Sequence, residues 1–140
     1  MATFNYRLGM ARFGHKEINC GATAGAGDAF NLTFVTSAYT PDQNADDVIA
    51  DIPGGAVVLT ETLPNCFMDS GGIFRADDFI SSAGVPSGST IAALVISHNS
   101  TGALLRYIDA ADGLVYATDD EVIVVTWPGV GIFRLGAAQI

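Results

Sequence analysis

Two histidines, His15 and His98, are the first candidates for catalysis, because imidazole is the commonest general base in enzymes. Neither lies at the spacing of the H-E-x-x-H, G-x-S-x-G or S-x-x-K motifs, all of which the sequence lacks. His15 follows Gly14, a predicted helix cap, which indicates a surface position. His98 ends a predicted strand before a turn, where polar side chains are expected. We therefore predict no catalytic residue and no enzyme activity.

A Gly/Ala-rich segment, residues 21–27, has the composition of a phosphate-binding loop. Its context does not fit, since no strand clearly leads into it and no Lys-Ser or Lys-Thr pair follows its last glycine. Phe30 also stands where a dinucleotide-binding fingerprint needs its third glycine. We interpret the segment as a flexible loop and predict no cofactor.

The potential metal ligands are Cys20, Cys66 and several groups of acidic residues. The cysteines belong to no C-x-x-C pair, and no clustered histidine would complete a zinc site. The acids lack the pattern of a calcium loop, although oxygen ligands from separate loops are an alternative. We interpret the acids as turn-capping residues and solubilising charge, and we predict no metal site. For the cysteines we expect free thiols, with a disulfide as the alternative.

The chain carries a formal charge of −9, from 6 Lys+Arg and 15 Asp+Glu in 140 residues. Because nucleic-acid binding needs clustered cations, and the six here are scattered, we predict neither a nucleic-acid nor an anionic-membrane partner. The longest apolar runs, residues 91–96 and 122–125, are far shorter than the ~20 residues that cross a bilayer. The first residues lack the features of a signal peptide, which predicts synthesis in a cytosol. The acid excess either complements a basic partner or only keeps the domain soluble.

The elements that would position these residues are mostly strands. Apolar spacing predicts a helix over residues 4–13, and a capping box at Thr40-Pro41-Asp42-Gln43 predicts a second over 41–50. Alternation and turn residues predict the strands, which cover residues 30–35, 56–63, 73–76, 89–97, 103–108, 121–127 and 131–135. The fold class that we predict is mainly β. We expect an antiparallel β-sandwich or barrel-like single domain, residues 1–140, with one or two short helices in the N-terminal third.

The chain is 49% hydrophobic and 15% charged, which is more apolar than one small core can hide. Oligomerisation or docking is the natural use of this surplus. We predict an interface that includes a chain terminus, with Met1, Phe4, Tyr6 and Ile140 as its candidate residues. Trp127 is interpreted as a core or core-edge residue, with an interface anchor as the alternative.

Several motifs occur in an order that resembles a known family. They are the N-terminal helix ending before Glu17-Ile18-Asn19, FNLTFVTSAYTPDQNADDVIADI at 30–52, FRADD at 74–78, LRYID at 105–109 and TWPGVGIFRL at 126–135. This order is similar to that of small structural virion proteins of tailed bacteriophages, which include head decoration, or cement, proteins. The sequence departs from that family in its Gly/Ala-rich loop at 20–27, and it lacks a Gly-Tyr pair before the strand at 56–63.

The resemblance implies a structural role without catalysis. It implies a capsid decoration protein on the virion surface, synthesised in the bacterial host cytoplasm, whose partners are the major capsid protein and copies of itself in a homo-oligomer. A tail, connector or fibre-base component is the alternative within the virion. Outside it, the rivals are a small-ligand or glycan-binding β domain and, last, a hydrolase with dispersed acids.

Overall fold

A computed structural model of the chain describes residues 3–111, 113–129 and 131–134. Its longer elements are one helix, α1 (Arg7–Gly14), and the strands β2 (Phe30–Val35), β3 (Val57–Thr62), β8 (Ala93–His98) and β9 (Leu104–Ile108). The short strands are β1 (Phe4–Asn5), β4 (Phe67–Met68), β5 (Ile73–Arg75), β6 (Phe79–Ile80), β7 (Thr90–Ile91), β10 (Tyr116–Ala117), β11 (Val124–Val125) and β12 (Phe133–Arg134). Two 3-10 turns, Ile49–Asp51 and Gly54–Ala56, complete the list.

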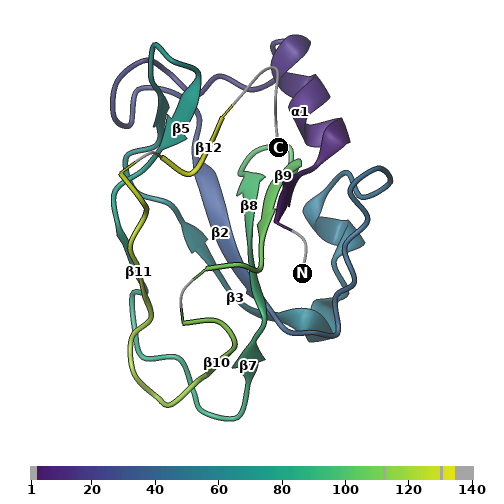
Figure 1. Ribbon diagram of the computed structural model, residues 1–140, viewed down its shortest axis with the longest axis vertical. Helices are drawn as coiled ribbons and strands as arrows, with labels where there is room; N and C mark the ends of the chain where they lie inside the picture. Colours follow the sequence, from purple (N-terminus) through teal and green to yellow (C-terminus); the bar gives the residue numbers. More distant parts are fainter. Residues whose placement is uncertain (1–2, 112, 130, 135–140) are drawn as a thin grey trace.

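A five-stranded antiparallel sheet in the order β1-β9-β8-β2-β3 forms the centre of the molecule (Figure 1). The predicted turn after His98 joins β8 and β9 as a hairpin. Three smaller antiparallel sheets, β10-β7, β11-β6 and β12-β5-β4, accompany it. The mainly β, antiparallel, sandwich-like fold with one short helix is therefore confirmed, and none of the sheets among the described residues closes into a barrel.

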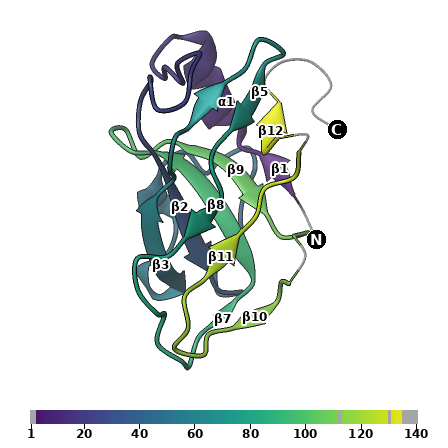
Figure 2. The ribbon, with the colours of Figure 1, turned by 90° about the vertical axis from the view of Figure 1, so that its left-hand side faces the viewer.

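Both faces of the central sheet are covered, which explains why all six residues of β8 are buried. Leu94 and Ile96 face one core, together with Phe30 and Phe74. Ala93 and Val95 face the other, which lies under the segment at 39–56. A strand buried on both faces reads as a continuous apolar run, and this is what residues 91–96 show. Figure 2 shows β11 and the β5–β12 segment lying in front of the sheet.

Helix α1 begins at Arg7, later than predicted, because Phe4 and Asn5 pair with β9. Gly9 lies inside the helix, where glycine normally weakens it. Its packing explains the choice, because a Cβ at this position would stand 1.8 Å from the carbonyl oxygen of Leu104. The helix backbone therefore lies directly against β9, and only glycine allows this approach.

The helix predicted over residues 41–50 is wrong. The carboxylate of Asp42 accepts hydrogen bonds from the backbone amides of Asn44 and Ala45, which closes a local turn. The backbone of Asp47 then turns to β9, since its carbonyl accepts the amide of Leu104 at 2.8 Å. Short acidic side chains compete with the helix for backbone amides, and here β9 also binds a backbone carbonyl that a helix would need. Only the 3-10 turn Ile49–Asp51 is helical there.

The predicted strands after residue 60 are shorter in the structure. The segment 89–97 divides into β7 and β8, and 121–127 keeps only the two residues of β11. Outside β8 and β9, the chain after residue 60 forms turns and short strands. These strands pair into three small sheets, which cover one face of the central sheet as narrow ribbons.

Candidate functional site

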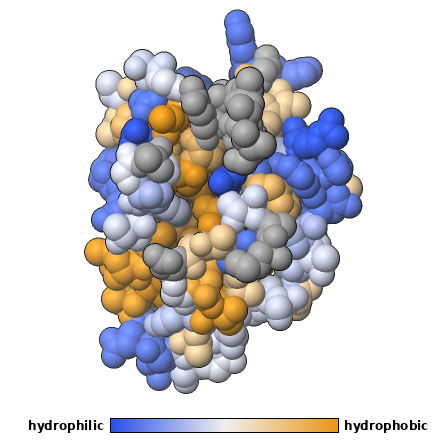
Figure 3. All heavy atoms as spheres, in the orientation of Figure 1, coloured by the Kyte–Doolittle hydropathy of each residue, from blue (hydrophilic) through white to orange (hydrophobic). Residues whose placement is uncertain are grey.

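An open cleft of about 950 Å³ lies between one face of the central sheet and the ribbons that cover it. Its sheet side includes Phe34, Leu94, Arg106 and Ile108, together with Ile91 of β7. The opposite wall includes Leu114, Tyr116, Ile123, Val125 and Trp127. Figure 3 shows apolar side chains gathered on this face, over the side of the molecule that carries β11 and β10, beside a hollow.

Arg106 is the one charged side chain among the described residues that line the cleft. Its Nη1 donates a hydrogen bond of 2.8 Å to the side-chain oxygen of Asn5. Its Nε is buried and has no hydrogen-bond partner. Burial lowers the pKa of this guanidinium. The cleft thus combines apolar walls with an incompletely satisfied cation, which is the usual composition of a ligand-binding pocket.

In the sequence Arg106 is only one of six scattered cations, because its position at the cleft depends on the register of β9. Arg106 stands opposite Ile96, while Leu104 stands opposite Ser97, so Leu105 is an extra residue at a bulge. Because a bulge breaks the alternation of a strand, Leu105 and Arg106 both face the side of the cleft. No local sequence signal marks this bulge.

The cleft adjoins an apolar surface on the β6–β11 ribbon, which we name the ribbon patch and define as Ile80, Val122 and Val124. Val122 and Val124 also line the cleft. The side chains of Ile80, Val122 and Val124 are 63%, 45% and 58% exposed. Val124 stands opposite Ile80 in the ladder, so the two side chains share one face. The neighbouring residues Phe79 and Ile123 point inward and are buried. A paired group of exposed aliphatic side chains of this kind is typical of an interaction surface.

His98 is buried at 1% exposure, so it is a core residue and not the ordinary polar end of a strand. Its Nδ1 lies 2.7 Å from Oγ1 of Thr101, and its Nε2 lies 2.8 Å from Oδ2 of Asp28. The order Asp-His-Thr resembles a nucleophile triad, but Oγ1 of Thr101 also accepts the amide of Ala103. These contacts fasten the β8–β9 turn to the end of the Gly/Ala-rich loop.

The Gly/Ala-rich loop is held at both ends. The carboxylate of Asp28 accepts the backbone amide of Asn19 at 3.0 Å. Hydrogen bonds from that amide, and then from His98, lower the pKa of Asp28. The amide of Gly25 donates to the carbonyl of Cys66. The interpretation of residues 21–27 as a loop is confirmed, because they form turns and bends without helix or strand.

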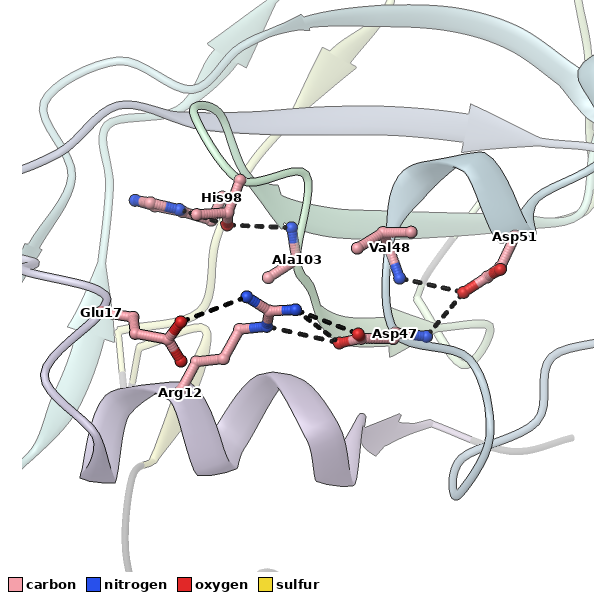
Figure 4. Close-up of polar contacts among 8 residues, drawn as sticks. Arg12, Glu17, Asp47, Val48, Asp51, His98 and Ala103 are labelled. Carbon is pink, nitrogen blue, oxygen red and sulfur yellow. Dashed lines mark hydrogen bonds and ion pairs between the residues drawn. The ribbon is translucent and has the colours of Figure 1, made fainter.

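Figure 4 shows a polar network that joins α1 to the segment at 47–51. Arg12 donates to both carboxylate oxygens of Asp47, at 3.0 Å and 3.2 Å, and pairs with Glu17 at 3.6 Å. The carboxylate of Asp51 accepts the amides of Asp47 and Val48, which lowers the pKa of Asp51. The charged groups here are paired within the chain, so the network stabilises the packing of α1 against the segment at 47–51.

The predicted interface residues occupy different environments. Tyr6 is fully buried, and its hydroxyl lies 2.7 Å from that of Tyr39. Its side chain therefore has no exposed surface to offer a neighbour. Phe4 is half-buried and stacks on Tyr107, with ring centroids 5.3 Å apart. Met1 and Ile140 lie outside the described residues, and the predicted interface at the termini stays a prediction.

Trp127 lies at the edge of the core, which agrees with its interpretation as a core or core-edge residue. It is half-buried, packs against the core and lines the cleft. Its indole Nε1 donates to the carbonyl of Asp77 at 3.1 Å. Cys20 and Cys66 are buried free thiols, and burial raises the pKa of each to about 12. His15 is exposed, as predicted.

Across the described ranges, no three His, Cys, Asp or Glu side chains come together as metal ligands. The part of the chain that the structure describes also contains no helix with the length and hydropathy of a membrane span. Comparison of the chain with family models, curated proteins and solved structures gives no match.

Proposed function

We propose that the chain is a structural virion protein of a tailed bacteriophage, and specifically a capsid decoration protein. The order of motifs in the sequence suggests this role, and the ribbon patch is the structural observation that supports it best. A decoration protein needs a stable domain with apolar surface to bury on its neighbours. Ile80 and Val124, both more than half exposed and paired across one ribbon, supply such a surface.

Its partners in this proposal are the major capsid protein and further copies of the chain. The mechanism is linkage: a protein that binds only the assembled shell stabilises that shell by mass action. The stabilisation grows with the free concentration of the protein and needs no catalytic group. A tail, connector or fibre-base component would use the same surface, and the position of the protein in the particle separates these roles.

The test is co-sedimentation of the purified protein with capsid shells prepared from the phage or prophage that encodes it. Val124→Asp places a charge in the ribbon patch, and we expect it to weaken binding about tenfold or more. Val115, 68% exposed and outside the ribbon patch, provides Val115→Asp as the matched control. Because both sites are exposed, we expect each variant to melt like the wild type.

A cryo-EM map of the intact particle completes the test. Density for the protein on the shell supports decoration, and density on the tail or connector contradicts it in favour of the alternative. If wild-type protein does not sediment with shells and is absent from the particle, the virion role is wrong.

The cleft supports a second candidate, a small-ligand-binding β domain. Its volume of about 950 Å³ lies within the range of about 300–1,000 Å³ that ligand pockets occupy. Gathering of apolar side chains around one cation is the observation that favours this candidate over a glycan-binding site, whose contacts would be mostly polar.

A further inference from the structure

The electrostatic environment of Arg106 differs from that of Arg12 and Arg75. Arg12 pairs with Asp47 at 3.0 Å and Arg75 with Asp69 at 2.8 Å, both near the surface. Arg106 is the one whose guanidinium is removed from water far enough to lower its pKa, yet no ion pair is formed with it by any described acid. Its single hydrogen-bond acceptor is neutral, the side-chain oxygen of Asn5.

Arg106 is half-buried, and a partly desolvated cation without an anion is costly because its lost hydration is not replaced. No acidic residue in the part of the chain that the structure describes offsets this cost with an ion pair. Arg106 lines a cleft whose other described lining residues are uncharged, and its Nε is buried without a hydrogen-bond partner. The cleft therefore has room for an anion from outside the chain beside Arg106.

We propose that the cleft binds an amphipathic monocarboxylate of the fatty-acid class, with its carboxylate on Arg106 and its apolar chain against the walls. A guanidinium offers parallel N–H donors that match the two oxygens of a carboxylate. Leu94, Ile108 and Ile123 provide aliphatic contacts for the chain. The net charge of −9 repels anions at long range, so the selectivity must come from Arg106 itself. This inference rests on the second candidate function and is independent of the virion role.

The experiment uses Trp127 as the reporter, because it is the one tryptophan of the chain and it lines the cleft. Purified protein is titrated with dodecanoate below its micellar concentration, and with dodecanol as the uncharged control of the same chain length. We expect a saturable change in Trp127 fluorescence and an affinity for dodecanoate about tenfold or more above that for dodecanol, since charge-assisted bonds are the stronger ones.

Two variants separate the carboxylate contact from the apolar contact. Arg106→Gln should remove most of the preference for the acid while dodecanol still binds. Ala111→Phe adds bulk at a half-buried lining position and should weaken both ligands alike. Arg7→Gln, at an exposed arginine outside the cleft, is the control and should bind as the wild type does. A thermal melt of each variant verifies that it is folded.

The proposal is overturned if the wild type shows no saturable response, or if it binds dodecanoate and dodecanol equally. It is also overturned if Arg106→Gln keeps the full preference for the acid, since the cation would then not be the anchor. If the isolated protein ignores dodecanoate and Arg106→Gln loses only binding to capsid shells, Arg106 serves a protein partner. The first three of these outcomes can occur whether or not the protein is a virion component.

Discussion

The central sheet and the β6–β11 ribbon bury their apolar side chains in different ways. All six residues of β8 are buried, because β8 has a strand on each edge and a packed layer on each face. In the ribbon, Phe79 is 2% exposed but its neighbour Ile80 is 63% exposed. One face of the ribbon packs on the sheet, and the other face is exposed to solvent.

Stability and recognition therefore depend on different regions of the molecule. The central sheet buries its apolar side chains within the chain, so substitutions there should change the free energy of unfolding. The ribbons and the loop at 109–116 form the outer wall of the cleft and carry most of the large exposed apolar side chains. Binding surfaces are commonly placed on such segments over a rigid scaffold.

The largest expected effect tests the sheet against the ribbon directly. Phe30→Ala removes a fully buried ring that contacts Phe74, with centroids 5.0 Å apart. We expect it to lower the free energy of unfolding by about 3–5 kcal/mol. The matched truncation Val124→Ala, at a side chain 58% exposed, should change it by less than about 0.5 kcal/mol. Equal losses in urea denaturation would show that the ribbon is as much a part of the core as the sheet.

Trp127 lies at the boundary between the two regions and should give an intermediate effect. Because its ring is only half-buried, we expect Trp127→Ala to lower the free energy of unfolding by less than the ~3–5 kcal/mol of a fully buried aromatic side chain. Loss of its hydrogen bond to the carbonyl of Asp77 contributes part of this. Thermal melting and shell binding should be measured together. A variant that melts as the wild type does but no longer binds would make Trp127 an interface anchor.

The smallest effect concerns pH. The pKa of Asp28 is lowered by its hydrogen bonds from Asn19 and His98, whereas an unfolded Asp titrates near ~3.9. Between the lowered pKa of folded Asp28 and that of an unfolded Asp, the unfolded chain binds more protons than the folded one. The free energy of unfolding should therefore fall as the pH drops below about 4. Above that range the contribution is complete.

The variant Asp28→Asn removes this contribution, so it should be less stable at neutral pH and lose less than the wild type on acidification. Denaturation curves from pH 7 to pH 3 provide the measurement. Identical slopes for both proteins would mean that Asp28 does not couple the loop to the sheet.

Much of the central sheet could be predicted from the sequence. Alternation at 30–35 and the turn at 99–102 are local patterns, and they correspond to β2 and to the β8–β9 hairpin. The first helix was also predicted, apart from its start. The second helix failed because its capping box is a local signal, while Asp47 gives its backbone to β9, a strand far along the chain.

The class of fold follows from the sequence alone, because the period of apolar residues and the positions of turn residues act over a few neighbours. The residues of the cleft and of the ribbon patch come together only through tertiary contacts. Arg106 reaches the cleft through a bulge, His98 meets Asp28 across 70 residues, and Ile80 meets Val124 in a two-residue ladder. Each of these depends on contacts between distant segments, which leave no periodic trace in the chain.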